Sequence, residues 1–168
     1  MLTRFVLKSL GRTAALICTV AIVPAGIHAQ GRDVPLGERA RGAERVVVGR
    51  VSAVTPVWLD NDFGDRLITS VVRVVVDETL KGASQQSVDV EVEGGTIGSL
   101  TLRVSDLDTF APGDRAVFYL EHNRRGALVP HLRGLGLQKL DQAGRVRGSS
   151  MTLDQVRREV RAGASRQP

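Results

Sequence analysis

The chain has 168 residues, 42% of them hydrophobic and 24% charged, with 23 basic residues against 18 acidic ones. This length suits one domain with its own hydrophobic core. The single cysteine excludes a disulfide within the chain, and the arginines are spread along it, which argues against a nucleic-acid-binding stripe.

Residues 1–29 resemble a cleavable secretory signal. Three basic residues precede an apolar run over residues 14–23, which is shorter than the roughly 20 residues that a membrane span requires. The segment ends in Ile-His-Ala, so we expect cleavage between Ala29 and Gln30. We therefore predict an exported protein, periplasmic or extracellular, whose mature chain has no membrane span and carries 20 basic and 18 acidic residues.

Three alternatives for this segment fit less well. An uncleaved membrane anchor would require a longer apolar run. A twin-arginine signal lacks its second arginine in TRFVLK. A lipoprotein would have a small residue before its cysteine, whereas Ile17 precedes Cys18.

Residues 30–42 are polar, rich in glycine and arginine, and without a period, so they are predicted to form a flexible arm. From 43 to 140 the pattern is that of a β-barrel. The stretch RVVVGRVSAV is a dense valine strand in which Gly49 suits a bend or bulge, and RLITSVVRVVVDETL is a second, longer strand. The acidic loop between them, VWLDNDFGDR, is predicted to be a hairpin loop.

The stretch VEVEGGTIGSLTLRV is predicted to form a hairpin with Gly94, Gly95 and Gly98 as its structural turn residues. A three-residue loop beginning at Gly94 would place Val90 opposite Leu100 and keep the apolar residues of both strands on one face, so we predict an odd loop or a glycine bulge near Gly98 instead of a two-residue turn. A phosphate-binding loop is disfavoured, because two glutamates precede the glycines and no helix follows.

The remaining strands and a helix follow in order. A Pro-Gly-Asp turn leads into an aromatic strand over 116–121, and NRRG is a tight connection to a glycine-rich final strand or strand pair in which Pro130 marks an edge or bulge. Residues 141–168 are predicted to form a loop, a short helix at about 152–162 and a disordered tail. Thr152 and Gln155 fit a capping box, and Gly163 is expected to end the helix.

These stretches together resemble a family of exported bacterial proteins with a small OB-like β-barrel, similar in fold to the N-terminal domain of tissue inhibitors of metalloproteases. The resemblance covers roughly residues 44–140. It implies a mainly β fold: a small closed or partly open OB-like barrel of about five to six antiparallel strands with a short C-terminal helix. The animal inhibitors chelate the protease zinc through an N-terminal cysteine, and no residue here matches that cysteine after removal of residues 1–29.

No catalytic, cofactor-binding or metal-binding residues are assigned. A serine–histidine–aspartate triad could combine Ser105 and Asp106 with His122 or His131, but no nucleophile-elbow motif supports it. The histidines are predicted to be ordinary hydrogen-bonded residues.

Calcium binding by the loop aspartates is also disfavoured. The EF-hand pattern that begins at Asp60 and continues through Asp62 has Gly64 and Asp65 at its fifth and sixth positions and Val71 at its twelfth, so the required ligands and glycine are misplaced.

Three functions therefore stand as hypotheses. The first is a non-enzymatic β-barrel interaction module that binds another exported protein, such as a protease or an envelope protein. The second is an OB-type module for oligosaccharides or single-stranded nucleic acid, which would require exposed aromatic residues. The third is a hydrolase with an unrecognised site. The aromatic residues after the signal are Trp58, Phe63, Phe110, Phe118 and Tyr119, with Phe118 expected in the core.

Overall fold

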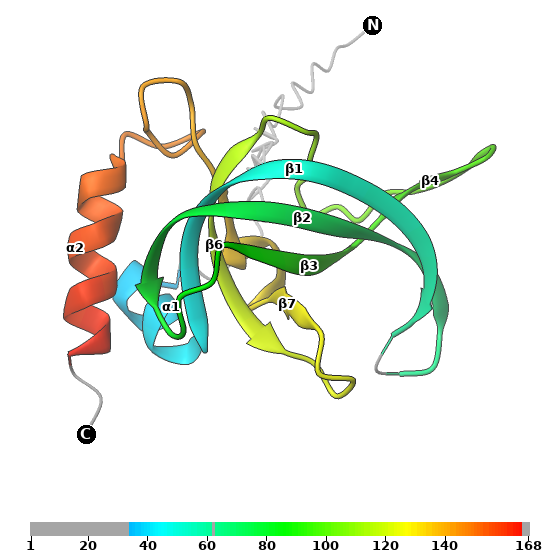
Figure 1. The fold of residues 1–168 in the computed structure, drawn as a ribbon, viewed down its shortest axis with the longest axis horizontal. Helices are drawn as coiled ribbons and strands as arrows, with labels where there is room; N and C mark the ends of the chain where they lie inside the picture. Colours follow the sequence, from blue (N-terminus) through cyan, green and yellow to red (C-terminus); the bar gives the residue numbers. More distant parts are fainter. Residues whose placement is uncertain (1–33, 62, 166–168) are drawn as a thin grey trace, which may run out of the picture. The chain divides into compact units, whose positions relative to one another are not determined.

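The computed structural model describes residues 34–61 and 63–165, so the predicted cleavage site at Ala29 and Gln30 lies outside the described residues. The elements, shown in Figure 1, are α1 (Leu36–Gly42), β1 (Arg45–Asp60), β2 (Arg66–Lys81), β3 (Ser87–Glu93), β4 (Gly95–Ile97), β5 (Leu100–Leu102), β6 (Arg115–His122), β7 (Leu128–Pro130), the 3₁₀ turn η1 (Arg133–Gly136), β8 (Leu137–Lys139) and α2 (Leu153–Ala164).

Five strands close into a ring. Neighbouring strands pair in the order β1-β2-β3-β7-β6, and β1 pairs with β6 to complete the ring. The mainly β, partly closed OB-like barrel expected from the sequence is confirmed. The strands are not all antiparallel, however, because β3 and β7 run parallel and meet at the single pair Val90 and Leu128.

The long strand β1 is bent so that it can serve two neighbours. Its register against β2 shifts between Val48 and Gly49 and again between Val51 and Ala53, so the bulge expected at Gly49 is present. Bulges increase local twist and bend a strand. The first half of β1 therefore lies between β2 and β6, while the second half continues with β2 alone as the arc in Figure 1.

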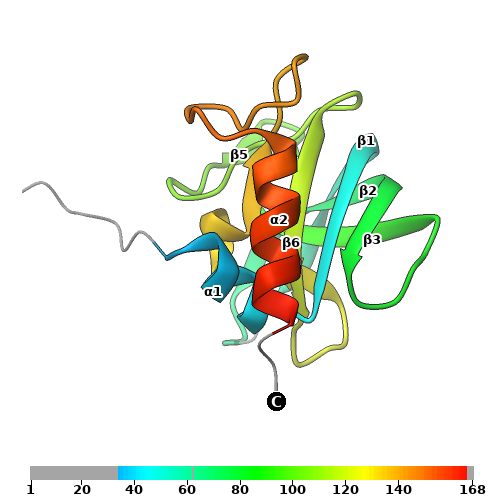
Figure 2. The ribbon, with the colours of Figure 1, turned by 90° about the vertical axis from the view of Figure 1, so that its left-hand side faces the viewer.

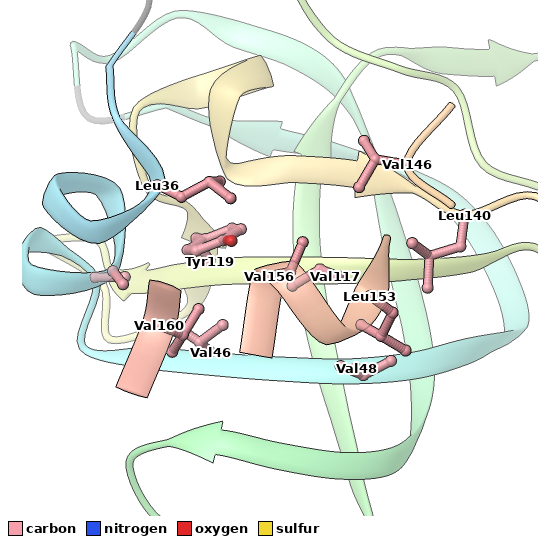
Figure 3. Close-up of a cluster of buried hydrophobic side chains, with 12 residues drawn as sticks. Leu36, Val46, Val48, Val117, Tyr119, Leu140, Val146, Leu153, Val156 and Val160 are labelled. Carbon is pink, nitrogen blue, oxygen red and sulfur yellow. The ribbon is translucent and has the colours of Figure 1, made fainter. Parts of the chain in front are cut away.

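Both faces of the β1–β6 pair are buried, each in a different core. One face points into the barrel and includes Val47, Phe118 and Leu120. The other face packs against the two helices, and Figure 3 shows this second core. Its buried members are Leu36, Ala40, Ala43, Val46, Val48, Val117, Tyr119, Leu140, Val146, Leu153, Val156 and Val160.

Helix α2 lies against the outer side of β6, as Figure 2 shows. Its predicted capping box is present: the Thr152 hydroxyl accepts the Gln155 amide, and the Gln155 side chain accepts the Thr152 amide. The expectation that Gly163 ends the helix is wrong. Gly163 lies inside α2 and is buried against α1, where an added Cβ would lie 2.6 Å from the Gly37 carbonyl oxygen. Within the described residues, neither helix has the length and hydrophobicity to cross a bilayer.

The flexible arm predicted over 30–42 is wrong for its second half, because Leu36–Gly42 forms α1. Leu36, Arg39 and Ala40 are buried, at the i, i+3 and i+4 spacing of one helical face. The Lys81 ammonium group, at the end of β2, donates to three carbonyl groups at the C-terminal end of this helix. A cation there satisfies free carbonyl groups and the helix dipole.

The strand pairing predicted for the glycine hairpin is wrong. Strand β3 does not pair with β5; instead β4 pairs with β5, with Ile97 opposite Leu100, and the turn lies at Gly98. Gly94 and Gly95 adopt φ angles of 110° and 141° and redirect the chain away from the barrel. Leu100 is consequently 57% exposed and does not join the core.

The tight crossing of α1 and α2 gives a test. Replacing a helical glycine with alanine usually stabilises a protein by about 0.5–1 kcal/mol. We expect Gly163→Ala to lower the free energy of unfolding by about 1–3 kcal/mol instead, because the new methyl group forces the helices apart. Urea denaturation measures the change.

The exposed neighbour Ala162 provides the control. Ala162→Ser should change the free energy of unfolding by no more than about 0.5 kcal/mol. An increase in stability for Gly163→Ala would show that the helices can separate without loss.

Candidate functional site

The residues considered for a catalytic triad have other partners. His122 Nδ1 lies 2.6 Å from a Glu44 carboxylate oxygen, and His131 Nδ1 lies 2.7 Å from a Glu121 carboxylate oxygen. The His122 contact lowers the pKa of Glu44. Asp106 is bound by an arginine, as described below, so the triad is not assembled.

The acidic loop between β1 and β2 forms a hairpin loop as predicted. The Asn61 side-chain oxygen accepts the backbone N–H groups of Phe63 and Asp65, both at 2.9 Å, which is an Asx-type turn. Asp62 lies outside the described residues. In the described ranges, no three His, Cys, Asp or Glu side chains gather as metal ligands would.

A groove of about 400 Å³ lies at the outer face of β2 and β3. The β1–β2 hairpin and the β6–β7 hairpin contribute its two sides, and both point the same way in Figure 1. Its lining residues are Asp60, Asn61, Phe63, Thr69, Glu91, Glu93, Leu107, Glu121, Asn123, Arg125, Val129, Pro130, Leu132 and Arg133. We refer to this feature as the acidic groove.

An excursion of the chain completes one side of the acidic groove. The His131 backbone N–H donates to the Tyr119 carbonyl. Leu137 pairs with Phe118, the residue that precedes Tyr119 in β6. Residues 132–136 therefore loop out between β7 and β8. Two short strands, β7 and β8, thus stand where one final strand or a strand pair was predicted, and the segment between them, which carries Leu132 and Arg133, borders the groove.

The excursion is held in an unusual conformation. Leu132 and Arg133 have φ angles of 57° and 55°, in the left-handed region that non-glycine residues rarely adopt. The loop before β6 is packed closely on it, since a Cβ on Gly134 would lie 1.6 Å from the Asp106 carbonyl oxygen. Contacts from two sides therefore fix the position of Arg133.

Arg133 links this excursion to two other segments. Its guanidinium group donates to both Asp106 carboxylate oxygens, at 2.9 and 3.3 Å, and to Glu93 at 3.3 Å. The hydrogen bond from Arg133 lowers the pKa of Asp106, and the same bond raises the pKa of Arg133.

The acidic groove carries more negative than positive charge. Its lining includes four carboxylates and two arginines, and both arginines are engaged with carboxylates. Arg125 lies 2.6 Å from Glu91, which also accepts the Asn123 side-chain amide. Asp60 forms no ion pair with the described residues.

Exposed apolar groups and one free hydroxyl adjoin these charges. Phe63 is 88% exposed, and Leu132 is 41% exposed. Thr69 is only 6% exposed, yet it lines the groove and its hydroxyl forms no hydrogen bond with the described residues. The hydroxyl oxygen itself is not fully buried, so it faces the groove and is available to a ligand.

A larger cavity, of about 600 Å³, lies on the other side of Leu107. The β4–β5 hairpin covers it, and barrel residues such as Val72, Val92 and Phe110 form its wall. Leu107 and Glu93 line both spaces.

The other candidates from the sequence are dispersed. Phe118 is fully buried, as expected, and so is Tyr119, whose burial raises its pKa to about 12. Phe110 packs on Phe118 with ring centroids 5.4 Å apart, and Trp58 is 41% exposed without lining the acidic groove. On α2, Arg157 forms ion pairs with Glu78 and Asp154, and Arg161 lies 3.9 Å from Glu78.

The acidic groove could not be identified from the sequence, since its lining comes from six separated stretches of the chain. The one local signal was the LRGLG stretch, whose paired glycines and leucines are unusual within a strand. No protein-family model matches the chain, and no curated protein is significantly similar to it.

The Asp106–Arg133 pair gives a pH-dependent prediction. Because the folded-state pKa of Asp106 is lowered, its contribution to stability is present above the unfolded-state pKa and is lost as the pH falls through the folded-state pKa. We expect Asp106→Asn to reduce the free energy of unfolding by up to about 1 kcal/mol at pH 7, with a smaller loss at pH 3.

Urea denaturation at the two pH values measures this difference. Asp108→Asn is the control, because Asp108 is exposed and forms no ion pair with the described residues. A loss for Asp106→Asn that is the same at both pH values would contradict the role of its charge.

Proposed function

We propose that this chain is an exported, non-enzymatic β-barrel module that binds another exported protein in the acidic groove. The observation that supports this best is the combination, in one groove between two hairpins, of an exposed aromatic ring, paired charges and a threonine hydroxyl that no other described residue binds. Exposed apolar groups surrounded by polar ones are typical of protein interaction sites.

The position of the groove in the barrel supports the same proposal. OB-type barrels bind ligands on the face of their second and third strands, between the loop that joins strands one and two and the loop that joins strands four and five. In the ring of five strands described above, these correspond to β2–β3, the β1–β2 loop and the β6–β7 loop. This support is an analogy of fold.

The proposal includes membership of the exported OB-like family that resembles tissue inhibitors of metalloproteases in fold. A zinc-chelating mechanism is not part of it, because the only cysteine, Cys18, lies within the predicted signal. Inhibition of a protease would have to use the groove or another surface.

An oligosaccharide ligand is the alternative, since an exposed ring such as Phe63 beside carboxylates can stack on and hydrogen-bond a sugar. Single-stranded nucleic acid is disfavoured, because phosphate groups would meet four groove carboxylates and two arginines that are already paired.

Phe63→Ala tests the proposed site. With tagged protein and the exported fraction of the host, we expect the variant to retain at most about a tenth of the specifically captured partner, because truncation of a central aromatic residue typically costs more than ~1.4 kcal/mol of binding. Quantitative mass spectrometry of the captured proteins gives the ratio.

Leu100→Ala is the matched control, because Leu100 is also an exposed apolar residue but does not line the groove. It should capture as much partner as the unmodified chain. Equal capture by all three proteins would place the binding surface elsewhere.

A further inference from the structure

We infer that the acidic groove binds an extended, basic segment of its protein partner, with lysine or arginine side chains directed at Asp60 and Glu93. This inference rests on the proposed function and specifies the chemistry of the partner.

Charge complementarity is the first argument. The groove lining carries two more carboxylates than arginines, although the chain as a whole has more basic than acidic residues. Asp60 has no ionic partner in the described part of the chain, and the Glu93 contact with Arg133 is long, at 3.3 Å. A cationic side chain gains attraction here, whereas an anionic one is repelled.

The edge of β3 is the second argument. This strand pairs with β2 along its length, but on its other side it meets β7 only at Val90. In the described residues, the stretch Glu91–Glu93 therefore has no strand partner on that side. Unpaired strand edges bind extended peptides through backbone hydrogen bonds.

Thr69 gives a third, independent argument. Its hydroxyl faces the groove without a hydrogen-bond partner in the described chain, and Thr69 stands directly opposite Glu93 in the sheet. A hydroxyl can both donate to and accept from a peptide group. A polar side chain of the bound segment that reaches across β3 would thus satisfy it, while the backbone pairs with the β3 edge.

Phe63 and Leu132 fit the same ligand. Each is exposed and lies beside carboxylates in the groove lining. The methylene groups of lysine and arginine pack on apolar side chains while their charged ends reach acidic groups, and a cation over an aromatic ring is itself favourable.

Three capped nonapeptides test the inference: threonine alternating with lysine, with glutamine, or with glutamate. Isothermal titration with the mature chain should give a Kd for the lysine peptide at least about tenfold below that for the glutamine peptide, and no binding of the glutamate peptide. Raising the salt concentration from 50 to 500 mM should weaken only the lysine peptide.

Substitutions in the acidic groove test whether the peptides bind there. Asp60→Asn combined with Glu93→Gln should remove the preference for lysine, and Asp60→Asn alone, which breaks no ion pair among the described residues, should weaken lysine-peptide binding even if the double variant is unstable. Thr69→Val should weaken the lysine and glutamine peptides equally, by about fivefold, through loss of one hydrogen bond.

Glu159→Gln is the control for net charge, because this exposed glutamate lies on α2 outside the groove. It should bind every peptide like the unmodified chain. Equal affinity for the lysine and glutamine peptides, no binding of any peptide, or lysine-peptide binding unaffected by the groove variants would each overturn the inference. The last outcome is a neutral oligosaccharide or partner protein whose binding depends on Phe63 but not on these carboxylates. That result would overturn the inference of a basic ligand and leave the proposed binding groove in place.

Discussion

The burial of both faces of the β1–β6 pair is the constraint on which the rest of this structure depends. A strand buried on one face alternates apolar and polar residues, whereas VVV in β1 and AVFYL in β6 are apolar without interruption. One set of side chains must fill the barrel, and the other must be covered from outside. Helices α1 and α2 supply that cover. The helices are therefore part of the barrel's stability, because without them the outer valines and Tyr119 would face water.

The same constraint connects the helical layer to the acidic groove. Arg39 of α1 is buried, lies over the Tyr119 ring at 6.0 Å and donates to the Leu135 carbonyl in the excursion. Arg133 then connects the excursion to Asp106 and Glu93. The groove is thus bordered by a chain of contacts that begins at the helix-covered outer face of β6. A binding site held by packed elements in this way is better preorganised than one on a free loop.

The sequence predicted what depends on local pattern. The valine strands, the bulge at Gly49, the Pro-Gly-Asp turn and the capping box each arise from residues close together in the chain. The pairing predicted for the glycine hairpin was wrong because it depends on residues far apart in the chain. Alternation in SLTLRV suggested a strand facing the core, but β5 leaves the barrel. Strand β3 pairs with β2 and β7 instead of with β5. Helix α1 was missed because seven residues with two glycines carry little helical signal until the second core is known.

The acidic groove could not be predicted for a related reason. Averaged over the chain after residue 29, basic and acidic residues nearly balance, and that balance favours no ligand. Folding separates the charges: Arg157 of α2 pairs with Glu78 and Asp154, while carboxylates from β1, β3 and β6 gather on one face. The closure of the barrel through a single β3–β7 pair places an unpaired strand edge beside those carboxylates. The proposed preference for a basic segment therefore depends on where the ring is incompletely closed, and net charge alone cannot reveal it.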